Sequence, residues 1–141
     1  MNNDIKMGSI ALKSTKYALT LLLILNFILP LIITLAVNQE AWFFGYKLGG
    51  IKASSWLLTN GIIGLVLAYS LLKDIKYSFL AVFLFFLVNF VNVMMVPLQG
   101  LTFSPFYSLG LILSLIGVVL KVRKNEHGSN FKPTFVTPLL L

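Results

Sequence analysis

The chain has 141 residues, of which 58% are hydrophobic and only 11% are charged. Soluble domains carry about 25% charged residues, so this composition excludes an ordinary soluble fold and predicts a membrane protein. The net charge of +7 comes from Lys and Arg at the ends of apolar runs, a placement that does not favour nucleic-acid binding. The absence of Cys excludes disulfides, thiolate metal sites and Cys nucleophiles.

Four stretches without Asp, Glu, Lys or Arg are long enough to cross a bilayer as helices, because about 20 helical residues cover the hydrocarbon core. These predicted spans cover residues 17–37, 55–72, 77–99 and 104–120. Only the sequence KDIK separates the second from the third, so these two helices are expected to be close antiparallel neighbours. The prediction is an all-α, up-and-down four-helix bundle over residues 17–120, with an N-terminal segment over 1–16 and a tail over 121–141.

The basic residues predict the orientation of this bundle. Only Lys47 and Lys52 fall in the connection between the first two spans, whereas the other nine Lys and Arg flank the opposite ends of the spans. By the positive-inside rule, both termini are expected in the cytoplasm, and the chain in the plasma or inner membrane. The first apolar run is longer than the about 7–15 residues of a signal peptide, so it is predicted to stay in the mature protein.

The outer connection, residues 38–54, is rich in aromatic residues, namely Trp42, Phe43, Phe44 and Tyr46. Aromatic side chains at this position are typical of anchors at the headgroup level, and a surface for a partner or a lipophilic ligand is the second interpretation.

The tail contains Phe131 and Phe135, and its Pro133 and Pro138 argue against a helix. An extended apolar segment of this kind needs a surface to lie on, so we expect the tail to dock on a partner.

Polar and small residues recur inside the predicted spans. They are Asn26 in the first, Asn60 and Gly64 in the second, Asn89 and Asn92 in the third, and Gly110 and Ser114 in the fourth. One interpretation is close helix packing with hydrogen bonds between helices. The other is the lining of a polar path or a ligand pocket.

Ionisable residues are missing from the spans. Asp4, Glu40, Asp74 and Glu126 fall in connections, and the single His127 falls in the predicted tail. The sequence therefore predicts no catalytic residue, no metal site, no cofactor and no soluble small-molecule substrate.

By elimination, we expect a non-catalytic accessory subunit of a larger membrane complex, such as an energy-converting one, whose partners are other transmembrane subunits and lipids. A homo-oligomeric passive channel lined by Asn residues is the first alternative. A small regulatory or immunity membrane protein is the second.

Overall fold

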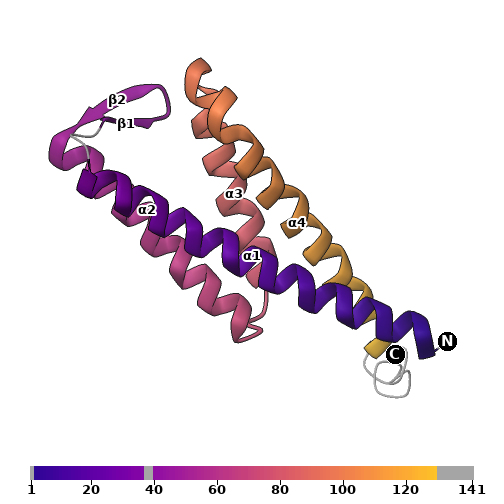
Figure 1. Ribbon diagram of the computed structural model, residues 1–141. Coiled ribbons are helices and arrows are strands. Elements are labelled where there is room, and N and C mark those ends of the chain that lie inside the picture. The colour runs from indigo at the N-terminus through magenta and orange to yellow at the C-terminus, as the bar shows by residue number, and fades with distance from the viewer. Residues whose placement is uncertain (1, 37–39, 130–141) are drawn as a thin grey trace, which may run out of the picture.

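The computed structural model describes residues 2–36 and 40–129. This part of the chain forms four α-helices and one β-hairpin (Figure 1). The predicted all-α class is confirmed for these residues, with the hairpin as an unforeseen addition. The elements in order are α1 (Asn2–Ala36), β1 (Glu40–Phe43), β2 (Tyr46–Gly49), α2 (Gly50–Leu72), α3 (Ser78–Met94) and α4 (Pro97–Ser129).

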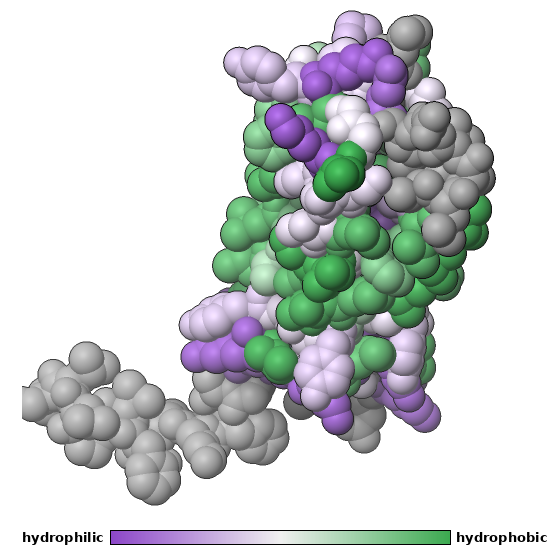
Figure 2. All heavy atoms as spheres, turned by 90° about the vertical axis from the view of Figure 1, so that its left-hand side faces the viewer, coloured by the Kyte–Doolittle hydropathy of each residue, from purple (hydrophilic) through white to green (hydrophobic). Residues whose placement is uncertain are grey.

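Three of these helices are long and apolar enough to cross a membrane. The apolar segments are Asn3–Ile32, Gly50–Leu72 and Gly100–Glu126. α3 is also apolar, but its 17 residues rise only about 25 Å. The face drawn in Figure 2 has a hydrophobic band between two more polar ends, as expected of a protein that sits in a membrane.

Several helix boundaries differ from those predicted. α1 includes residues 2–16, α2 begins at Gly50 rather than 55, and residues 97–99 belong to α4 instead of the third span. α4 also continues over residues 121–129, including His127, which were expected in an extended tail. The charges mark where a helix leaves hydrocarbon, whereas its backbone hydrogen bonds can continue into the polar region. The rest of the predicted tail, with Phe131 and Phe135, lies outside the described residues.

The helices are arranged as two close pairs. α1 packs along α2 and α3 packs along α4, and α1 also contacts α4. α2 and α3 were expected to be close neighbours, but they contact each other sparsely and diverge from the turn at residues 73–77 towards the β-hairpin (Figure 1). The hydrophobic core lies near this turn and contains the fully buried Leu19, Leu23, Leu71, Val82 and Phe86. The opposite end of the bundle is therefore more open.

The β-hairpin closes that open end. Its two-residue loop consists of Phe44 and Gly45, which both have positive φ angles of 44° and 83°. Such a loop matches the right-handed twist of paired strands, and here it pairs Phe43 with Tyr46. An ion pair of 2.7 Å between Lys47 and Glu40 also joins the two strands.

Candidate functional site

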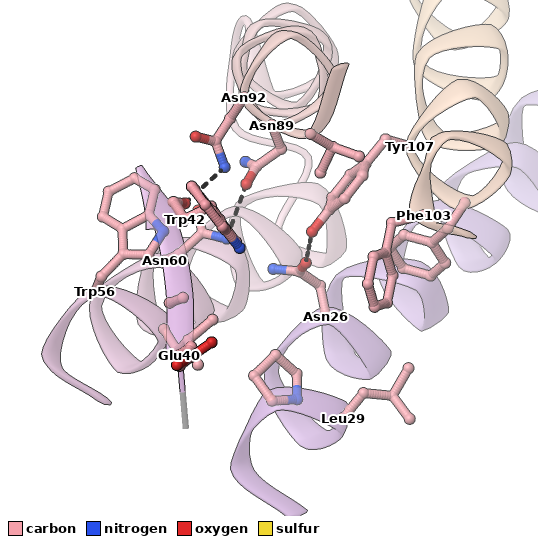
Figure 3. A pocket seen from close by; sticks show the side chains of 15 residues that line it. Asn26, Leu29, Glu40, Trp42, Trp56, Asn60, Asn89, Asn92, Phe103 and Tyr107 are labelled. Carbon is pink, nitrogen blue, oxygen red and sulfur yellow. Dashed lines mark hydrogen bonds between the residues drawn. The ribbon is translucent and has the colours of Figure 1, made fainter. Parts of the chain in front are cut away.

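A cavity of about 410 Å³ lies where the helices diverge, beneath the β-hairpin. All four helices and β1 contribute to its walls, which are mainly apolar but carry several amide groups (Figure 3). We call this cavity the amide pocket. Its lining residues are Asn26, Leu29, Pro30, Glu40, Ala41, Trp42, Trp56, Leu57, Asn60, Asn89, Asn92, Val93, Phe103, Phe106 and Tyr107.

The structure thus brings all four predicted asparagines to one place. Asn60 of α2 donates from Nδ2 to Oδ1 of Asn89 on α3, over 2.9 Å. The Asn89 Nδ2 in turn donates to the backbone oxygen of Phe85, one helical turn earlier, also over 2.9 Å. This pair links the two diverging helices, and it satisfies the buried amide of Asn89 at both ends.

Asn92 of α3 holds the β-hairpin. Its Oδ1 accepts a hydrogen bond of 2.6 Å from the backbone N–H of Phe44, and its Nδ2 donates one of 3.2 Å to the backbone oxygen of Trp42. One amide therefore binds a donor and an acceptor on either side of Phe43. A two-stranded hairpin is marginally stable by itself, so this attachment helps to keep the strands above the pocket.

Asn26 of α1 forms a different contact, with α4. The Tyr107 hydroxyl donates to its Oδ1 over 3.2 Å. Asn26 is only 4% exposed, and its Nδ2 has no hydrogen-bond partner in the described part of the chain. Figure 3 shows this nitrogen turned towards the side of the pocket from which Asn60 projects. Buried amide donors are nearly always paired, so this atom stands out.

The aromatic residues of the predicted outer connection have separate positions. Trp42 lines the pocket, while Phe43 packs edge-on against Trp56 of α2, with ring centroids 4.7 Å apart. Phe44 lies in the hairpin loop with its ring edge-on to Phe43, and Tyr46 is 74% exposed. Trp42 and Phe43 thus join the hairpin to the pocket and to α2, whereas Tyr46 faces outwards.

The small residues of the predicted packing stripes lie in helix interfaces. A Cβ atom added at Gly64 would lie 3.4 Å from the Leu23 backbone oxygen of α1, and one added at Gly110 would overlap the ring of Phe86. Ser114 is fully buried on α4 and donates to its own helix, at the Leu111 oxygen. Gly64 and Gly110 therefore allow α1 to approach α2 and α3 to approach α4.

Among the aromatic residues that line the pocket, sequence reasoning did not place Trp56, Phe103 and Phe106 in a site. A signal was present for Trp56, which precedes Asn60 by one helical turn and so shares its face. Phe103 and Phe106 of α4 offered no such signal, because their position depends on how α4 packs on α1.

The chemistry available at the pocket is hydrogen bonding and apolar contact. Of the described residues that line it, only Glu40 is charged, and its carboxylate pairs with Lys47. Among the described residues, no group of three or more His, Asp or Glu side chains lies close enough to hold a metal ion. Another ion pair, Lys16 with Asp74 at 3.3 Å, lies at the opposite end of the bundle.

Comparison with known proteins adds no assignment, since no family model, no curated protein and no solved structure matches this chain.

Proposed function

We propose that the chain is a non-catalytic accessory subunit of a larger integral membrane complex, and that it acts by helix packing. The observation that carries this proposal is where the polar groups lie. All four Asp and Glu residues of the chain fall at helix ends, in the hairpin or in a turn. The amides at depth are largely used in hydrogen bonds within the bundle. This arrangement favours a self-contained packing unit over a proton path.

The outward faces of the helices support the same role. Large apolar side chains such as Leu21, Ile62, Leu84 and Ile112 are about half exposed. Hydrocarbon and neighbouring transmembrane helices can both cover such faces, so the bundle offers contact surface on several sides.

In this proposal the chain crosses the membrane four times, with both termini in the cytoplasm. α3 then spans as well, with the bilayer locally thinned around its 17 residues. The end of the bundle that contains the turn at residues 73–77 carries three Lys side chains that lie over Tyr rings. Aromatic side chains are typical of the headgroup level, and an excess of basic residues is typical of the cytoplasmic side. These pairs are Lys16 with Tyr17, Lys73 with Tyr69, and Lys76 with Tyr77.

Purification of the tagged full chain in a mild detergent, followed by native mass spectrometry, tests the accessory role. We expect different subunits in fixed stoichiometry. A pure homo-oligomer would contradict the proposal and favour the channel alternative, and a single substoichiometric partner would favour the regulatory one.

A pair of variants tests whether the hairpin contributes to assembly. Tyr46→Ser removes an aromatic ring that is 74% exposed at the hairpin, and Tyr69→Ser removes one that is 58% exposed at the other end of α2. We expect the first to reduce co-isolation of subunits and the second to leave it unchanged. Equal co-isolation for both variants would show that the hairpin takes no part.

A further inference from the structure

The amide pocket has the size and composition of a ligand site. Ligand pockets span about 300–1,000 Å³ and combine apolar walls with a few convergent polar groups. This one has a volume of about 410 Å³, with the aromatic rings of Trp42, Phe103 and Tyr107 around the amides (Figure 3). Since all four helices and β1 line it, the pocket exists only in the assembled bundle.

One buried hydrogen-bond donor at the wall of the pocket has no partner among the described residues. Nδ2 of Asn60 donates to Asn89, Nδ2 of Asn89 donates to Phe85, and Nδ2 of Asn92 donates to the hairpin. By contrast, Nδ2 of the buried Asn26 has no partner among the described residues. Turning the Asn26 amide over would leave its oxygen unpaired instead, so either orientation leaves one polar atom for a ligand. In the orientation that the structure has, the Tyr107 hydroxyl donates to Oδ1, so the free atom is the donor Nδ2 and requires an acceptor.

The charge around the pocket favours an uncharged ligand. Glu40 is the charged residue on the described wall, and the Lys47 ammonium at 2.7 Å compensates it. A phosphate head would find no unpaired cation on the described wall of the pocket. An ammonium head would have to compete with Lys47 for the Glu40 carboxylate. The indole N–H groups of Trp42 and Trp56 can only donate, which again suits an acceptor such as a carbonyl oxygen.

The pocket also reaches the apolar surface of the bundle. Leu29 on α1 and Phe103 on α4 both line it, yet they are 47% and 43% exposed. They lie on the same side of the pocket in Figure 3. An apolar chain can therefore leave the pocket between α1 and α4, towards the region that lipid occupies around a membrane protein.

From these observations we propose that the amide pocket binds a membrane-soluble lipophile with an uncharged, carbonyl-bearing head. A carbonyl oxygen accepts the hydrogen bond from Asn26 Nδ2, the head lies against the aromatic walls, and the tail passes Leu29 and Phe103. Quinone rings and the ester groups of a diacylglycerol share this chemistry. The site goes beyond the accessory role and does not depend on it, because it lies within a single chain.

The two tryptophans of the chain, Trp42 and Trp56, both line the pocket and report on its occupancy. The full chain is placed in nanodiscs and titrated with decylbenzoquinone, a neutral dicarbonyl probe that quenches tryptophan fluorescence. We expect saturable quenching. Excess dioctanoylglycerol should relieve it if ester carbonyls also fit, and should not if the site is restricted to quinones. Decylbenzene, which lacks an acceptor, should not compete.

Variants separate binding from partitioning into lipid. Asn26→Leu removes the donor at similar volume and should raise the apparent Kd about 10-fold, the effect of one hydrogen bond. Ser114→Ala, which removes a buried hydroxyl outside the pocket, should leave it unchanged. Leu29→Phe removes no polar group but narrows the exit for the tail, and it should also weaken binding.

Three results would overturn the proposal. The first is quenching that rises without saturation, as partitioning alone would give. The second is displacement of the probe by decyltrimethylammonium but not by a neutral carbonyl compound, which would assign the pocket to a cation. The third is an unchanged Kd in both Asn26→Leu and Leu29→Phe. If Asn26→Leu does not fold, judged by its tryptophan emission maximum, Leu29→Phe decides alone.

Discussion

Asn92→Leu should release the β-hairpin from the bundle without unfolding the helices. The substitution keeps the volume of the side chain but removes the acceptor for the Phe44 N–H and the donor to the Trp42 oxygen. Each hydrogen bond contributes about 0.5–1.5 kcal/mol. Attachment of the hairpin therefore weakens by about 1–3 kcal/mol, which raises the population of the open form about 5–150-fold.

Hydrogen exchange measured by mass spectrometry detects this opening, because exchange of the Phe44 amide follows the population of the open form. Asn89→Leu is the matched control, since it changes the same residue type on the same helix but removes bonds to Asn60 and Phe85 instead. We expect faster exchange at Phe44 only in Asn92→Leu. Equal exchange in the two variants, or no change in either, would refute the argument that Asn92 holds the hairpin.

Three further predictions concern topology, packing and the tail. In this Cys-free chain, Lys47→Cys should react with an impermeant maleimide only from outside and Lys124→Cys only from inside; reaction on the same side would mean that α3 does not cross. Gly110→Ala should destabilise the bundle by about 1–3 kcal/mol in thermal unfolding, because a Cβ overlaps a packed ring, and Gly8→Ala, in open space, should not. Equal melting temperatures would contradict that packing. Deleting residues 131–141 should release partner subunits while membrane insertion persists, and unchanged co-isolation would exclude a docking role for the tail.

The amino-acid sequence determined the helical class of this protein and predicted that it lies in a membrane. Uncharged apolar runs of about 20 residues have few stable forms other than membrane helices, because hydrocarbon leaves backbone groups no partner outside the chain. The structure confirms the helices, and three of them are long and apolar enough to span. The sequence also identified Asn26, Asn60, Asn89 and Asn92 as the polar residues inside the helices. The orientation of the helices in the membrane and the function of the protein stay predictions.

The β-hairpin and the amide pocket were decided only by the tertiary structure. The hydrogen bonds that build them join residues 48, 50 and 81 positions apart, as in Phe44 with Asn92, Trp42 with Asn92, and Asn26 with Tyr107. Helical periodicity places a residue on a face, but it does not say which face of another helix lies opposite. Which helix faces lie opposite each other depends on how α2 and α3 diverge above the core. This divergence makes room for a pocket at one end of the bundle.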